Sequence, residues 1–181
     1  MTPNKPLILQ GYALELPTRP GWVRLTLLLA VLLTWLPWPA AMAGWAPDFL
    51  LMTLLYWAWR APLYAGIGTA FALGLLVDVE RGAWLGGYAL TYSAAAYTVL
   101  RLRVRLGGFA WGARAAHLAL VLVAATLLTL ALGTLFGGVV DAWFMASGIT
   151  AAVTWPGLAW LLDGTGRVTV AYQPSSRSTP S

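Results

Sequence analysis

The sequence of 181 residues has no cysteine, one histidine and only 9% charged residues. Without cysteine the chain can form neither a disulfide nor a thiolate metal site, and it has no thiol nucleophile. One histidine and six scattered acids offer no recognisable metal-ligand spacing. A G-x-x-x-x-G-K-[ST] phosphate loop is also absent, so the chain is not itself a P-loop ATPase. These absences favour a protein that is not an enzyme and that carries no cofactor or metal.

Apolar residues dominate what is present: they make up 60% of the chain, which includes eleven tryptophans. A mean hydropathy of +0.73 is that of an integral membrane protein, not of a soluble domain. Most of the apolar runs approach the roughly 20 residues that cross a bilayer as a helix. We therefore predict an all-α bundle of about six transmembrane helices, over residues 22–38, 48–59, 63–79, 83–100, 115–137 and 142–162.

The basic residues predict the orientation of this bundle, because lysine and arginine near the ends of spans stay on the cytoplasmic side. With the N-terminus inside, every basic residue except Arg81 is cytoplasmic, and an even number of spans returns the C-terminus to the cytoplasm. This distribution also explains the net charge of +5 without a nucleic-acid partner.

Three regions follow from composition. Residues 1–21 are predicted to be a flexible cytoplasmic segment, residues 22–165 the transmembrane domain, and residues 166–181 a disordered cytoplasmic tail. The second apolar run is short, since the 12 residues from Asp48 to Trp59 rise only about 18 Å as a helix. It either spans the membrane or forms a re-entrant hairpin with the third run. We favour six spans because Arg60 fits the cytoplasmic interface better than the bilayer centre.

Small residues recur at helical spacing in three segments: Gly66, Ala70 and Gly74; Gly82, Gly86, Ala89 and Ser93; and Ala142, Ala146, Thr150 and Thr154. Such faces allow helix backbones to approach closely in lipid, where packing drives association. We expect Gly86 and Gly87 to lie inside a helix on such a face. The faces predict packing within the bundle, with a partner protein, or in a homodimer.

Asp78 lies near the C-terminal end of its predicted helix, where the helix dipole disfavours a negative charge. An acid at membrane depth is a candidate functional residue. Asp78, with Gly74, Gly86 and Arg81, is therefore a candidate contact for a partner or ligand. The alternative is that Asp78 closes the turn structurally, with Arg81 as its local partner. Asp48 and Asp141, in contrast, each open a helix and are explained as N-caps.

Two further groups have polar side chains. Arg101, Arg103 and Arg105 leave the fourth predicted helix on the cytoplasmic side, where they can anchor the chain among anionic lipid headgroups or dock a partner. His117 and Ser147 are a conceivable base and nucleophile. They are expected near opposite ends of their spans, which argues against a catalytic pair.

Several motifs occur together in a fixed order: Pro47-Asp48, Leu54-Leu55-Tyr56-Trp57, Gly74-x-x-x-Asp78, Gly82-x-x-Leu85-Gly86-x-x-x-Leu90 and Trp155-Pro156. In this order and spacing the chain resembles the rod shape-determining protein MreD family of bacterial inner-membrane proteins. The resemblance implies a multi-pass, non-enzymatic component of the cell-elongation machinery that helps direct lateral peptidoglycan synthesis.

The resemblance also implies partners. They are an MreC-like single-span periplasmic scaffold and, directly or through it, MreB-like filaments and the peptidoglycan polymerase–transpeptidase pair. The family bundle is similar to the substrate-binding membrane subunits of energy-coupling vitamin transporters. A transport subunit is therefore the alternative function, although similarity of fold does not establish transport.

Overall fold

The computed structural model describes residues 20–39, 44–82, 85–106, 111–136 and 144–165. The described residues form six helices and no strand: α1 (Pro20–Thr34), α3 (Phe49–Arg60), α4 (Ile67–Glu80), α5 (Gly87–Leu106), α6 (Trp111–Leu135) and α7 (Phe144–Thr165). This confirms the predicted all-helical architecture. Two stretches, Gly112–Leu135 and Phe144–Asp163, are long and apolar enough to cross a membrane. The six spans, the cytoplasmic termini and the roles of residues 1–21 and 166–181 stay predictions.

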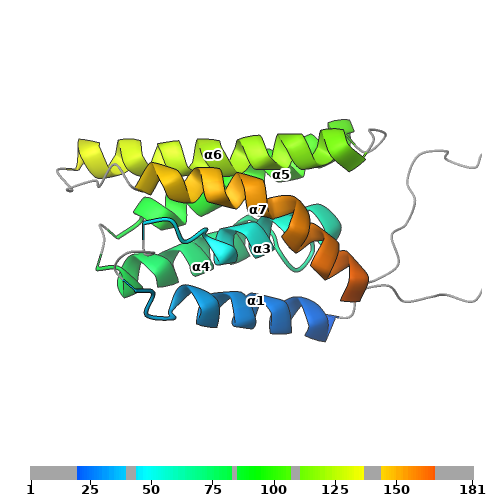
Figure 1. Cartoon of the computed structure of the whole chain (residues 1–181), viewed down its shortest axis with the longest axis horizontal. Helices are drawn as coiled ribbons and strands as arrows, with labels where there is room; N and C mark the ends of the chain where they lie inside the picture. The colour runs from blue at the N-terminus through cyan, green and yellow to red at the C-terminus, as the bar shows by residue number, and fades with distance from the viewer. Residues whose placement is uncertain (1–19, 40–43, 83–84, 107–110, 137–143, 166–181) are drawn as a thin grey trace, which may run out of the picture.

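Successive helices run back and forth between two ends of one bundle, and the start of α1 lies at the same end as the end of α7 (Figure 1). We name the end that carries Asp48 and Glu80 the acidic end. The opposite end, which carries Arg60 and Arg114, is the basic end.

Helix α3 is the central helix, with α1, α5, α6 and α7 packed against it. Every residue from Leu50 to Ala58 is buried, as expected for a helix that is apolar on all sides. Trp57 donates its indole N–H to Thr26 Oγ1 at 2.7 Å, which links α3 to α1. Helix α4 packs instead on α5. The choice between a full span and a re-entrant hairpin for residues 48–59 stays a prediction.

The contact between α4 and α5 depends on Gly74. A Cβ atom on Gly74 would lie 2.5 Å from Ala89 Cα and 2.6 Å from the Tyr88 carbonyl oxygen. Ala70 and Ala89 are completely buried in the same contact region. The predicted close packing of these two small-residue segments is thus confirmed at Gly74 and Ala89, within the bundle.

Gly86 does not lie inside a helix, contrary to our prediction. It precedes α5 and has a φ of +104°, and Gly82 in the same connection has a φ of +57°. Residues with a Cβ rarely adopt these left-handed conformations, and an α-helix excludes them. The two glycines therefore turn the chain between α4 and α5 and do not extend the packing face.

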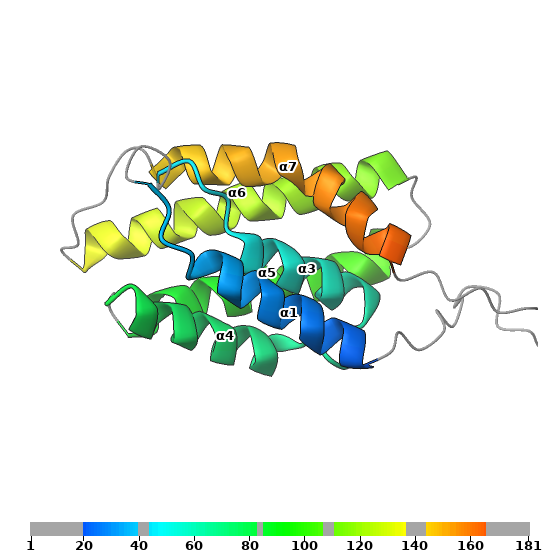
Figure 2. The same cartoon turned by 60° about the horizontal axis from the view of Figure 1, so that its bottom comes forward.

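Helix α7 buries a different face from the one predicted. Ala146 and Thr150 are only half-buried and Thr154 is exposed, whereas Gly148, Ala151 and Trp155 are buried. A Cβ on Gly148 would lie 2.6 Å from Thr126 Oγ1, so this glycine allows close contact with α6. Ala142 and Asp141 lie outside the described residues. Both views show α7 bending along its length (Figure 2), and Pro156 inside the helix accounts for a bend because it cannot donate a backbone hydrogen bond.

Candidate functional site

A cavity of about 360 Å³ lies at the acidic end, beside the N-terminus of α3. It exists because α3 is only 12 residues long and starts well inside the bundle, so the longer helices around it enclose the remaining space. Residues in or next to every described helix contribute to the lining. The polar ones are Thr34, Trp38, Asp48, Glu80, Arg81, Tyr88, Thr91, Tyr92, Thr126, Thr129 and Ser147. We call it the acidic-end cavity.

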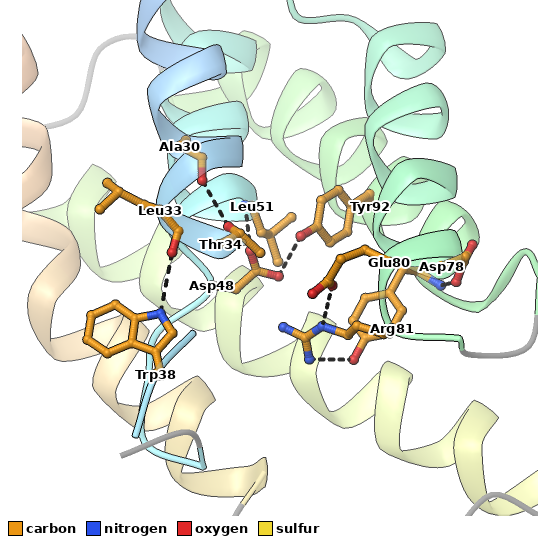
Figure 3. A network of polar contacts seen from close by, with 11 residues as sticks. Ala30, Leu33, Thr34, Trp38, Asp48, Leu51, Asp78, Glu80, Arg81 and Tyr92 are labelled. Carbon is orange, nitrogen blue, oxygen red and sulfur yellow. Dashed lines mark hydrogen bonds and ion pairs between the residues drawn. The ribbon is translucent and has the colours of Figure 1, made fainter. Parts of the chain in front are cut away.

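Asp48 has two roles in this cavity (Figure 3). Its Oδ1 accepts the backbone N–H of Leu51 at 2.9 Å, which confirms the predicted N-cap of α3. Its Oδ2 accepts the hydroxyl of Tyr92 at 2.6 Å, which joins the start of α3 to α5. Tyr92 is almost completely buried, so one carboxylate fixes two helices at the base of the cavity.

Glu80 and Arg81 form a second polar pair in the cavity lining. Arg81 Nε lies 3.7 Å from Glu80 Oε2, and Arg81 Nη1 donates to the Tyr88 hydroxyl at 2.9 Å (Figure 3). The guanidinium carbon also lies 5.0 Å from the centroid of the Tyr88 ring, within the range of a cation–π contact. Both Glu80 and Arg81 remain exposed, so their charges are accessible at this end of the bundle.

Asp78 is fully buried and caps α5. Its carboxylate accepts the backbone N–H groups of Gly86 at 2.8 Å, Tyr88 at 2.8 Å and Ala89 at 3.2 Å. The first amides of a helix have no partner within the helix, and their positive end stabilises an anion. The predicted pairing of Asp78 with Arg81 is wrong, because Arg81 contacts Glu80 and Tyr88. The geometry matches the alternative in which Asp78 closes the turn.

At the basic end, Arg60 and Asp163 form an ion pair between the ends of α3 and α7. Asp163 Oδ1 also accepts the Tyr56 hydroxyl at 2.6 Å. On α5, Arg101 donates to the Tyr97 hydroxyl at 3.0 Å, and both side chains are exposed.

Arg103 and Arg105 lie in the last turn of α5. Arg105 is exposed and Arg103 is half-buried, and neither lines the acidic-end cavity. The three arginines of α5 are therefore grouped at the basic end, away from the Asp48 and Glu80 carboxylates.

The structure separates the conceivable catalytic pair. His117 lies near the start of α6 and contacts the Ala113 carbonyl oxygen through Nδ1 at 2.7 Å. Ser147 lies near the start of α7, at the opposite end of the bundle, and donates to the Phe144 carbonyl oxygen at 2.7 Å. Among the residues that the structure describes, no three His, Asp or Glu side chains are grouped as metal ligands.

Comparison with known proteins identifies the family of this bundle. The family model described as rod shape-determining protein MreD matches residues 20–163, which contain all of α1 to α6 and nearly all of α7. The chain belongs to the MreD family. The resemblance on which the sequence analysis relied is therefore confirmed, and both Asp48 and Asp78 lie inside the matched region.

A curated MreD from Haemophilus influenzae is 36% identical to the chain over 73 residues. The aligned segment covers 40% of this chain and 45% of that relative, so the chain aligns with less than half the length of the curated protein. No solved structure matches the chain. Membership of the MreD family connects the chain to rod-shape determination and to a family of membrane proteins.

In this MreD-family chain, sequence reasoning found Asp48 and Asp78 but not all of their partners. The bond between Asp48 and Tyr92 joins residues 44 positions apart, which no local spacing reveals. The sequence predicted no role for Glu80, which forms an ion pair with its neighbour Arg81. The spacing of Tyr88 and Tyr92 could have indicated these partners. The two tyrosines are four residues apart, so they lie on one face of a helix.

We expect Tyr92→Phe to destabilise the protein by about 2 kcal/mol, because a buried hydrogen bond to a carboxylate is lost while Asp48 stays in place. Tyr97→Phe is the matched control: it removes a hydroxyl from the same helix, but an exposed one, and should change stability by less than about 0.5 kcal/mol. Thermal unfolding in mild detergent measures both. Equal effects of the two variants would show that the Asp48–Tyr92 bond does not fix the base of the cavity.

Proposed function

We propose that this MreD-family chain is a non-enzymatic, six-span protein of the bacterial inner membrane that binds an MreC-like single-span scaffold. Through the scaffold it helps to direct lateral peptidoglycan synthesis and so to maintain rod shape. The observation that supports this most strongly is the family match, which covers almost the entire described bundle.

The acidic end is the proposed contact for the scaffold. Orientation by the positive-inside rule puts this end on the periplasmic side, where such a scaffold has its main domain. Glu80 and Arg81 are exposed there and can meet charged residues that flank a partner's span. Gly74, Asp78 and Gly86 act indirectly in this proposal, because they hold α4 and α5 in position and so position Arg81.

The basic end has the complementary role. Arg101, Arg103 and Arg105 anchor α5 among anionic lipids, and they are available to MreB-like filaments on the cytoplasmic side. The polymerase–transpeptidase pair is reached through the scaffold, and a homodimer remains an alternative assembly for the exposed apolar faces.

A charge-swap experiment tests the scaffold contact. We expect Arg81→Glu to reduce co-purification of the scaffold about tenfold, because a like charge replaces a complementary one at the interface. Cells that depend on this variant should become round while the protein remains at its normal level in the membrane.

The double variant Glu80→Arg with Arg81→Glu is the control, because it restores the local ion pair with its polarity reversed. Recovery of scaffold binding and rod shape in the double variant would contradict the proposed contact. That result would mean that the two charges matter only to each other.

One observation favours the transporter alternative. The acidic-end cavity, at about 360 Å³, falls within the roughly 300–1,000 Å³ range of small-molecule sites. A substrate-binding subunit would dock a separate ATPase module, so co-purification of paired ATPases would favour this function over scaffolding.

A further inference from the structure

A second cavity, of about 150 Å³, lies at the basic end between the end of α3, the start of α6 and the end of α7. It is separate from the acidic-end cavity and has no role in the function proposed above. Its walls combine aromatic and charged side chains: Tyr56, Trp59, Arg60, Arg114, Trp155 and Asp163. We call it the basic-end cavity.

Arg114 is the unusual residue of this cavity. Its Nε is buried and has no hydrogen-bond partner among the described residues. In that part of the chain no carboxylate forms an ion pair with Arg114 either. Burying a donor without a partner costs free energy, so the Nε–H group of this half-buried arginine is suited to an anion that enters from outside the chain.

The other charges of the basic-end cavity are already paired. Asp163 accepts hydrogen bonds from both Arg60 and Tyr56, which leaves Arg114 without a counter-ion among the described residues. The two arginines and one aspartate of the lining sum to a charge of +1. Arg114 also lies in the first turn of α6, where free backbone N–H groups favour an anion.

We propose that the basic-end cavity binds a phosphate group of single negative charge, with Arg114 as its principal ligand and Arg60 in support. A phosphodiester carries one negative charge and so neutralises the excess charge of the lining. The planar guanidinium of Arg114 can form two parallel hydrogen bonds to phosphate oxygens. The cavity is large enough for the phosphate itself, while Trp59 and Trp155 provide apolar surface for the groups attached to it.

Two sources of this chemistry are available: the headgroup of an anionic phospholipid and free phosphate. The lipid source rests on the proposed membrane placement, in which the basic end faces the cytoplasmic leaflet. Basic pockets between membrane helices on that side bind anionic headgroups, whereas surface arginines attract them without defined geometry.

Native mass spectrometry of the full chain in mild detergent tests the proposal, with phosphatidylglycerol, phosphatidylcholine and inorganic phosphate as separate probes. We expect Arg114→Gln to weaken retention of phosphatidylglycerol about tenfold. Arg24→Gln is the matched control, because it removes the same charge from an exposed site near the start of α1, at the same end of the bundle, and should leave retention within about twofold. Arg114→Lys should give an intermediate result, since lysine keeps the charge but loses the paired donors.

The outcomes distinguish a lipid headgroup from free phosphate and also show whether the proposal fails. Retention of phosphatidylglycerol that depends on Arg114 supports a lipid headgroup, and binding of inorganic phosphate alone that depends on Arg114 supports free phosphate. Equal losses in Arg114→Gln and Arg24→Gln, or no Arg114-dependent binding of any probe, would overturn the proposal.

Folding of the variants is checked by their unfolding temperature without added lipid, which Arg114→Gln should not lower, because the buried Arg114 Nε has no hydrogen bond to lose. This experiment is independent of scaffold binding: failure of the phosphate proposal leaves the charge-swap result intact, and the converse also holds.

Discussion

Gly74→Ala is expected to lower the stability of the bundle by about 3 kcal/mol, the upper part of the range for overpacked cores. The added Cβ would lie 2.5 Å from the Cα of Ala89, so the clash is with backbone and no side-chain rotation relieves it. Helices α4 and α5 must then move apart. Their displacement would also disturb Arg81 and Tyr88, which these helices position beside the acidic-end cavity.

Gly68→Ala provides the matched control for Gly74→Ala. Gly68 lies on the same helix and is exposed, and a methyl group added there would have no atom of another residue within 4 Å beyond its own helix backbone and chain neighbours. Alanine at this position should stabilise α4 by about 0.5–1 kcal/mol through its higher helix propensity.

Thermal unfolding of the two variants in the same detergent makes the comparison. A loss of about 3 kcal/mol corresponds to a fall of about 10 °C in the midpoint for a chain of this size. Similar midpoints for Gly74→Ala and Gly68→Ala would contradict the close contact between α4 and α5.

Asp78→Asn is expected to cost about 3 kcal/mol. The carboxylate accepts three backbone N–H groups at the start of α5, and hydrogen bonds to a charged group contribute about 1.5–3 kcal/mol each. Asparagine has one acceptor oxygen, and its amide N–H₂ would face another donor. The favourable interaction of the negative charge with the N-terminus of α5 is lost as well.

Glu80→Gln removes the same charge two residues away, from an exposed side chain, and should change stability by less than about 0.5 kcal/mol. Unfolding temperature and rescue of rod shape are measured for both variants. Asp78→Asn should lose both stability and the ability to restore rod shape, because Asp78 affects function only by stabilising the fold. A variant of normal stability that cannot support rod shape would instead assign Asp78 a direct contact with a partner.

Much of the fold could be predicted because a bundle of apolar helices is encoded by local features. The apolar runs predicted the six helices. Small residues four positions apart predicted the close α4–α5 contact at Gly74. The cap by Asp48 also follows from local chemistry, since an acid immediately before a helix can accept its free amides.

The remaining features depend on the path of the chain between helices. The sequence spacing alone could not place Gly86 outside α5. Gly82 and Gly86 are four residues apart, which is also the spacing of small residues on a helix packing face. The role of Asp78 depends on that turn, because Gly86, which has a φ of +104°, donates its backbone N–H to the Asp78 carboxylate from outside α5. The long-range pairs Asp48–Tyr92 and Arg60–Asp163 needed the packing of whole helices.

The measurement that tests the central claim most directly is affinity purification of the tagged protein from its own bacterium in mild detergent, followed by mass spectrometry of the proteins that co-purify. Our account predicts recovery of the single-span shape scaffold together with cell-wall synthases. Recovery of paired ATPases with a coupling subunit, in the absence of the scaffold, would contradict it.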